Sequence, residues 1–183
     1  MRPAFVWIVH PRLVVVVGNP KPRSRTLAMA EAVATASAAA AGLDPDVERL
    51  TIDLADYGGE LFDWSSSRVG EIVAATAGAS LAVVASPTYK ATYTGLLKAY
   101  LDWFGQTGLS GVTVVPVMVG AGAHHALAVE VHLRPVLVEI GATVPTRGLY
   151  VTEDELDDLH PVLDRWLGEA GPVLARTVRP TLT

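Results

Sequence analysis

The stretch LVVVVGNPKPRSRT, residues 13–26, decides the fold of this chain of 183 residues. Its first five residues are apolar and mostly β-branched, without polar alternation. That pattern indicates a strand covered on both faces, as in a parallel sheet. The strand ends at Gly18, and a polar loop then leads into an alanine-rich helix predicted over residues 26–41, which stops at Gly42. The stretch therefore predicts the first strand, loop and helix of an α/β protein.

The same order repeats along the chain. Four more apolar segments predict strands, two of them strong and two weaker, at residues 81–85, 112–119, 47–52 and 143–151. Helical patterns fall between and after them, at residues 68–77, 93–104 and 126–140 and from Pro161 onward. Pro135 must kink or restart the fourth of the five helices. Five strand–helix units predict an open, doubly wound parallel sheet. We expect one domain over residues 1–183, with 1–11 as an N-terminal extension to which no structure is assigned.

Composition excludes several classes of protein. The chain has a net charge of −5, is 50% hydrophobic and contains no cysteine. Intrinsic disorder, disulfides, thiol catalysis and zinc–thiolate sites are thereby excluded. Without a basic surplus we expect no nucleic-acid partner. No window holds the roughly 18 apolar residues of a membrane span, and the N-terminus lacks signal-peptide features. We therefore expect a cytoplasmic protein without a membrane partner.

Ligands of such sheets bind at the carboxyl ends of the strands. The loop after the first strand, residues 18–26, has three basic residues and two hydroxyls directly before a helix. It matches neither a dinucleotide fingerprint nor a Walker A loop. Free N–H groups and the partial positive charge of a helix N-terminus favour a phosphate monoester here. An ordinary N-cap with solvated basic neighbours is the alternative.

The second and third loops favour a flat ring. Residues 86–95 combine Pro87 with two tyrosines and a glycine, a setting that suits a heteroaromatic ligand, although Tyr93 also fits a core position. Residues 120–122, Gly-Ala-Gly, allow close backbone approach, or form a plain turn. His124 and His125 lack supporting ligands, so we expect no metal site. Gly-x-Ser-x-Gly is absent, so we expect no Ser/His/Asp nucleophile.

Together the three loops resemble a known family. SPTYKATYTGLLK, residues 86–98, resembles the signature of the NAD(P)H-dependent FMN reductases of flavodoxin-like fold. Within this family, the sequence resembles the subfamily of reductases that supply reduced flavin to alkanesulfonate monooxygenases. Residues 18–26 resemble their phosphate loop, and residues 120–137 resemble their third loop and the helix after it. The resemblance covers residues 13–150.

The resemblance implies a three-layer αβα sandwich whose five-stranded parallel sheet has the order 2-1-3-4-5. It implies a homodimeric or homotetrameric FMN reductase that oxidises NADPH or NADH. Hydride would pass from nicotinamide C4 to flavin N5, chemistry that belongs to the cofactor, so no side chain is expected to be catalytic. A flavin-dependent monooxygenase is the implied partner.

The family's ligand contacts transfer to fifteen positions of this sequence. The flavin phosphate would bind at the first loop, through Asn19, Lys21, Ser24, Arg25 and Thr26. The ring would lie against Pro87, Thr88, Tyr89, Lys90 and Tyr93, with Thr94 and Gly95 beside them and with Gly120, Ala121 and Gly122 at its far edge. The sequence departs from the family at Ala121, where many relatives carry glycine, and in its stiff Pro-Lys-Pro-Arg loop. His132 stands near the place where some relatives carry an extra aromatic residue.

Other functions fit the same motifs. An FMN-containing quinone, azo or chromate reductase would share the fold and keep its flavin. A flavodoxin-like electron carrier would not turn over NAD(P)H, and a further alternative is a relative that binds no flavin. The third helix carries more aromatic surface than one sheet contact needs once Trp103 is counted, which favours a dimer. Alternatively, Trp103 packs under residues 105–111 of the same chain.

Overall fold

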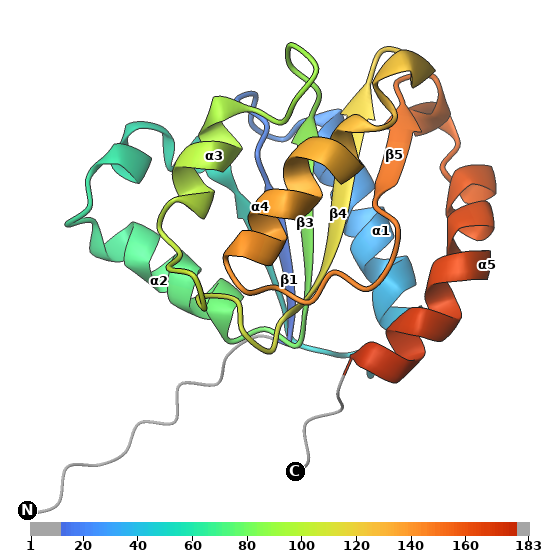
Figure 1. The fold of residues 1–183 in the computed structure, drawn as a ribbon, viewed down its shortest axis with the longest axis horizontal. Coiled ribbons are helices and arrows are strands. Elements are labelled where there is room, and N and C mark those ends of the chain that lie inside the picture. Colours follow the sequence, from blue (N-terminus) through green and yellow to red (C-terminus); the bar gives the residue numbers. More distant parts are fainter. Residues whose placement is uncertain (1–11, 179–183) are drawn as a thin grey trace, which may run out of the picture.

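Strand β1 (Leu13–Val17) pairs in parallel with β2 (Arg49–Asp53) on one side and with β3 (Leu81–Pro87) on the other. Two further strands, β4 (Thr113–Gly120) and β5 (Leu149–Thr152), continue the sheet beyond β3, so that the order in this computed structural model is β2-β1-β3-β4-β5 (Figure 1). The predicted fold class and strand order are therefore confirmed. The structure describes residues 12–178, and the predicted extension at residues 1–11 lies outside them. That residues 1–183 form one domain stays a prediction.

Helices and short helical turns connect the strands. The strands after β1 are β2 (Arg49–Asp53), β3 (Leu81–Pro87), β4 (Thr113–Gly120) and β5 (Leu149–Thr152). The α-helices are α1 (Arg25–Ala40), α2 (Ser67–Ala77), α3 (Gly95–Leu101), α4 (Arg134–Glu139) and α5 (His160–Thr177). The short turns are η1 (Leu54–Asp56), η2 (Gly58–Phe62), η3 (Ala123–His125), η4 (Val129–Leu133) and η5 (Glu155–Asp157). The third and fourth helices are shorter than predicted.

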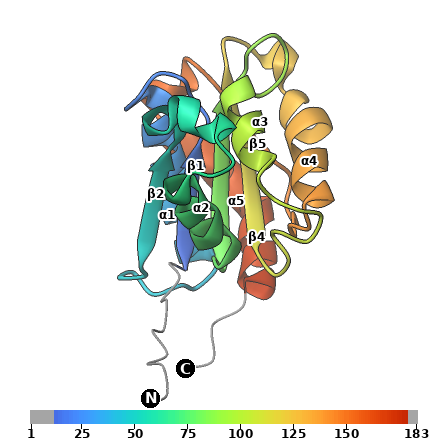
Figure 2. The same cartoon turned by 90° about the vertical axis from the view of Figure 1, so that its left-hand side faces the viewer.

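Helices cover both faces of the sheet (Figure 2). On one face, Val15 of β1 and its same-face neighbours pack against Met29 of α1 and Leu174 of α5. On the other face, Val14 and Val16 pack with side chains of α2, α3 and α4. All five residues of β1 are fully buried. This two-sided burial is why the strand sequences show no polar alternation.

Proline occurs within β4, at Pro116, where a missing N–H would break a hydrogen-bonded ladder. Pro116 lies opposite Val84 of β3, but the pairing with β5 begins only at Val117. The strand can therefore hold a proline because β5 does not pair with it at this residue.

The predicted fourth helix is interrupted, as Pro135 required. Residues 129–133 form a single π-helical turn, η4, and α4 starts again at Arg134 with Pro135 in its first turn. Pro135 has no N–H to continue the helical ladder, and a π-turn is one way in which a helix absorbs such a break. His132 is exposed on this turn.

An ionic network holds η4 and α4 against the loop that precedes β5. Glu130 accepts hydrogen bonds from Arg134 Nε at 2.6 Å and from Gly148 N at 2.5 Å. Arg134 also donates to Val144 O, at 2.7 Å, and to Thr146 O. Burial opposes ionisation of Glu130, but these hydrogen bonds outweigh it and hold the pKa of Glu130 below its ordinary value.

Trp103 is covered from within the chain. Its Nε1 donates to Leu61 O at 2.9 Å, and its ring centroid lies 5.0 Å from that of Trp64. Its indole therefore packs against η2 and against Trp64, which follows that turn. Trp103 is partly buried by its own chain, and assembly through the third helix stays a prediction.

No helix between residues 12 and 178 is long and apolar enough to span a membrane.

We predict that Glu130→Gln lowers the free energy of unfolding at neutral pH by about 1–2 kcal/mol, because two hydrogen bonds to a charged group are weakened. Since the folded-state pKa of Glu130 is lowered, its contribution is complete above the ordinary glutamate pKa of about 4.3 and is lost as the pH falls further. Urea unfolding of both proteins between pH 3 and 7 measures this. A difference that stays constant down to pH 3 would contradict it.

Candidate functional site

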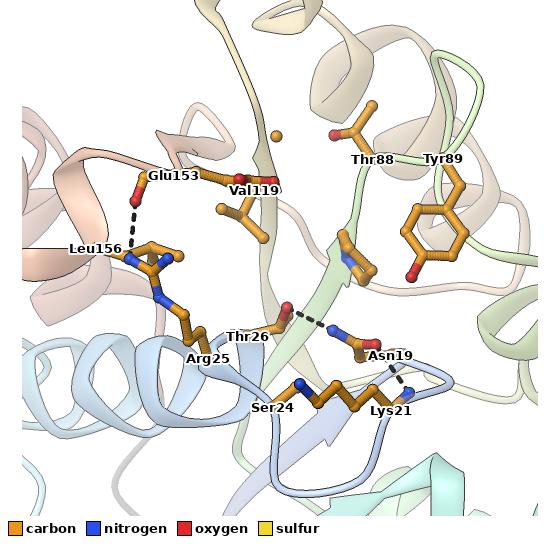
Figure 3. A pocket seen from close by; sticks show the side chains of 12 residues that line it. Asn19, Lys21, Ser24, Arg25, Thr26, Thr88, Tyr89, Val119, Glu153 and Leu156 are labelled. Carbon is orange, nitrogen blue, oxygen red and sulfur yellow. Dashed lines mark hydrogen bonds between the residues drawn. The ribbon is translucent and has the colours of Figure 1, made fainter.

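A cavity of about 250 Å³ opens at the carboxyl ends of β1, β3 and β4 (Figure 3). Its lining comes from all three predicted loops and from the segment after β5, and consists of Asn19, Lys21, Ser24, Arg25, Thr26, Pro87, Thr88, Tyr89, Val119, Gly120, Glu153 and Leu156. The cavity lies where β1 is followed by a connection to one side of the sheet and β3 by a connection to the other. Ligands of doubly wound folds bind at this switch point.

The start of α1 presents hydrogen-bond donors to the cavity. Ser24 caps the helix, and its Oγ accepts from Leu27 N at 3.3 Å. Thr26 Oγ1 accepts from Asn19 Nδ2 at 3.0 Å. Because each hydroxyl is already an acceptor, its proton is free to be donated elsewhere. The first N–H groups of a helix also have no carbonyl one turn earlier to bind.

Asn19 and Asp53 hold the first loop in place. Asn19 Oδ1 accepts from Lys21 N at 2.9 Å, so both ends of its amide bind within the loop. Asp53 Oδ2 accepts from Arg23 N at 2.9 Å. Arg23 has a φ of +50°, a left-handed conformation that costs a non-glycine residue about 1 kcal/mol. The loop is therefore fixed in a conformation that it would not favour by itself.

The basic residues of the loop point in different directions. Arg25 reaches across the cavity mouth, where its Nη2 donates to Glu153 O at 2.9 Å (Figure 3). The same nitrogen also donates to the Asp157 carboxylate, at 2.9 Å. Lys21 lines the cavity, and its side chain runs toward Ser24 in the same view. The Arg25–Asp157 pair is largely exposed and adds little stability. Its visible effect is to join the first loop to the segment after β5.

The second loop forms a tight hairpin. Tyr89 and Thr92 exchange backbone hydrogen bonds of 2.8 and 3.2 Å, and Lys90 and Ala91 between them have φ values of +51° and +68°. Lys90 is exposed at the tip. Tyr89 is 52% exposed and lies across the cavity from Arg25 (Figure 3).

Beyond the hairpin, the second loop turns into the core. Thr94 caps α3, accepts from Leu97 N at 3.1 Å and donates to Gly18 O, which ties the second loop to the first. Tyr93 packs against the hydrophobic core, and burial raises its pKa. The sequence was compatible with either a ligand contact or a core position for Tyr93, and the structure shows its side chain against the core.

The third loop depends on Tyr150 of β5. The Tyr150 hydroxyl donates to Gly122 O at 2.9 Å, and burial raises the pKa of Tyr150, so it remains a donor at neutral pH. A Cβ at Gly120 would lie 2.3 Å from this hydroxyl and 3.2 Å from Thr88. An alanine at position 120 would therefore have to displace the Tyr150 hydroxyl, whereas glycine leaves the backbone there open to the cavity.

The structure brings nine of the fifteen predicted contact residues together in the cavity lining, from all three loops. The other six lie outside that lining: Lys90, Tyr93, Thr94, Gly95, Ala121 and Gly122. The sequence did not indicate Val119, Glu153 or Leu156 as lining residues, nor the supporting roles of Asp53 and Tyr150. Asp53 ends β2 and Glu153 follows β5. Their positions at the carboxyl ends of predicted strands are the one sequence feature that could have indicated these two residues.

The two histidines of the third loop lie together, with ring centroids 4.0 Å apart. Within residues 12–178, no group of three or more histidine, aspartate or glutamate side chains is arranged to hold a metal ion.

The fold and the cavity define a class: a flavodoxin-like α/β protein with a cavity at the carboxyl ends of β1, β3 and β4, next to the start of the first helix. The model of the NADPH-dependent FMN reductase family matches residues 11–156, and the chain belongs to that family.

Individual relatives agree with this assignment. The chain is 37% identical over 78 residues to the FMN reductase (NADPH) of Escherichia coli, covering 43% of this chain and 41% of that protein. It is 38% identical over 84 residues to the NADH-dependent FMN reductase SfnF of Pseudomonas putida, covering 46% and 45%. The matches thus span less than half of these relatives. The apo structure of the NADH:FMN oxidoreductase EmoB superposes with a TM-score of 0.68 at 29% identity, over 87% of this chain and 90% of that one.

We predict that Gly120→Ala destabilises the protein by about 1–3 kcal/mol, because the added methyl group displaces the Tyr150 hydroxyl. Tyr150→Phe removes that hydroxyl, so the double variant should be more stable than the sum of the two single effects implies. Urea unfolding of the four proteins measures the coupling. Strictly additive effects would show that the two residues do not compete for the same space.

Proposed function

We propose that this protein is an NAD(P)H-dependent FMN reductase that binds FMN in the cavity described above. The observation that carries the proposal is the start of α1, where Ser24, Arg25 and Thr26, the cap and the first two residues of the helix, line one cavity. A phosphate monoester carries nearly two negative charges at neutral pH and accepts several hydrogen bonds. A helix N-terminus with Ser24, Thr26 and Lys21 around it suits such a group.

The remaining lining suits the flavin ring. Pro87 and Tyr89 offer apolar surface on one side, and Gly120 leaves its backbone uncovered at the base. Thr88 Oγ1 is buried beside the Tyr150 hydroxyl, and Thr88 lines the cavity, so this hydroxyl can serve a polar ring atom. Thr94, Tyr93 and Tyr150 support these loops from behind.

FMN, when bound, supplies the two-electron chemistry with NADPH or NADH. The residues of this chain would bind FMN and orient it for reaction with the pyridine nucleotide. The helix start would hold the phosphate end and Tyr89 would border the ring, while the Arg25–Glu153 contact limits the cavity mouth on the side of β5. No side chain in the lining is required to take or give a proton.

The decisive experiment is steady-state oxidation of NADPH and of NADH with FMN varied. We expect a rate that rises with free FMN and saturates, with flavin lost on dilution. Tightly bound flavin, with a rate insensitive to added FMN, would instead favour a quinone, azo or chromate reductase. Bound flavin that neither pyridine nucleotide reduces would favour an electron carrier.

We predict that Ser24→Ala combined with Thr26→Ala weakens FMN binding about 10- to 100-fold, because two hydrogen bonds to a charged phosphate are lost. Riboflavin has no phosphate, so its affinity should change much less. Fluorescence titration with both flavins measures this. Thr35→Ala is the matched control, since Thr35 is an exposed hydroxyl of the same helix whose Oγ1 donates to Glu31 O. Equal losses for both flavins would contradict the phosphate assignment.

We also propose a homodimeric or homotetrameric cytoplasmic enzyme that delivers reduced flavin to a monooxygenase. Three apolar side chains support assembly, one just before η4, one on η4 and one on α4: Leu127, Val131 and Val138 are 67%, 56% and 54% exposed. Large exposed apolar side chains that gather on one segment are typical of interfaces.

A further inference from the structure

Asp53 is a nearly buried carboxylate outside the cavity lining. It is the last residue of the edge strand β2, lies opposite Val17 of β1 and is 8% exposed. Its Oδ2 accepts from Arg23 N at 2.9 Å, and its Oδ1 accepts from Ala55 N at 3.3 Å, which caps η1. One side chain thus joins the first loop to the segment after β2, across 30 residues of sequence.

The contact with Arg23 falls at the strained point of the loop. Arg23 has a φ of +50°, and no glycine is present there to relax it. A left-handed conformation in a non-glycine residue persists only when surrounding contacts enforce it. The hydrogen bond from this residue's own N–H to Asp53 is such a contact, since it fixes the peptide plane that leads into Arg23 relative to the end of β2.

The strained residue directly precedes the cap of α1. Ser24 follows Arg23 and caps the helix, and Thr26 binds Asn19 two residues later. Asn19 anchors the loop from within, through Lys21 N and Thr26 Oγ1, whereas Asp53 anchors it from the neighbouring strand. Release of the second anchor would let Arg23 leave its left-handed conformation and would shift Ser24, and with it the donors of the first turn.

We propose that Asp53 is a positioning residue that holds the phosphate-binding loop in its working conformation and thereby sets the preference for FMN over riboflavin. The inference rests on the proposed function. A negative charge near an anion site opposes the anion, so the benefit of Asp53 comes from its hydrogen-bond geometry and not from its charge. A neutral side chain that keeps the acceptor oxygen should therefore preserve binding.

Two variants separate geometry from charge. Asp53→Ser keeps a short cap for Ala55 N but is too short to hold Arg23 N as well, since serine carries its oxygen directly on Cβ. Asp53→Asn keeps one acceptor oxygen, which should face Arg23 N because that hydrogen bond is the shorter of the two. Asp56→Ser is the matched control, because Asp56 is an exposed carboxylate on the adjacent turn.

FMN and riboflavin affinities are measured for each protein, after melting curves show that it is folded. In Asp53→Ser we expect at least about a tenfold loss of FMN affinity, with riboflavin changed less than about threefold. Asp53→Asn should bind FMN nearly as the wild type does, and Asp56→Ser should not differ from it. An unchanged ratio of the two affinities in Asp53→Ser would overturn the proposal, as would an equal loss in Asp53→Ser and Asp53→Asn.

Glycine at position 23 provides an independent check. Glycine adopts a φ of +50° without strain. Arg23→Gly introduced into Asp53→Ser should therefore recover part of the lost FMN affinity, whereas Arg23→Gly in the wild type should bring no such gain. No recovery would contradict the role given to the strained turn. A wild type that binds FMN no better than riboflavin would overturn the proposed function itself, and this inference with it.

Discussion

The structure depends on the pairing of β1 between β2 and β3. Five buried residues hold this strand in the sheet on both sides, and its loop opens at the same edge as the loop of β3. The loop after β1 leads to α1 on one face of the sheet, and the loop after β3 leads to α3 on the other face. The cavity lies between these two loops. Thr94 closes this arrangement by donating to Gly18 O, so that the two loops hold each other at a fixed separation.

The site is rigid at its base and open at its mouth. Buried or half-buried groups such as Asn19, Asp53 and Tyr150 hold the loops from behind through hydrogen bonds. The groups at the mouth, Lys21, Arg25 and Tyr89, are exposed. A loop whose backbone is already held in place loses little conformational entropy when a ligand binds, and the exposed side chains at the mouth can still adjust to that ligand.

Membership of the FMN reductase family and the site geometry support each other through different observations. The family match rests on sequence between residues 11 and 156, whereas the cavity results from the positions of atoms. The segment after β5 contributes Glu153 and Leu156 to the lining, at the very end of that match. Arg25 is the residue that connects the two regions, since it donates to Glu153 O and pairs with Asp157.

The sequence by itself determined the fold class, the approximate strands and helices, the break at Pro135 and the three loops that meet at the cavity. These follow from local patterns, because strands buried on both faces, helix caps and proline act over a few residues. Only the tertiary structure decided that Arg25 turns toward Glu153, that residues 61–64 cover Trp103, and that Asp53 and Tyr150 support the loops. Each of these contacts joins residues at least 28 positions apart, and such pairings follow from the packed sheet and not from any local pattern.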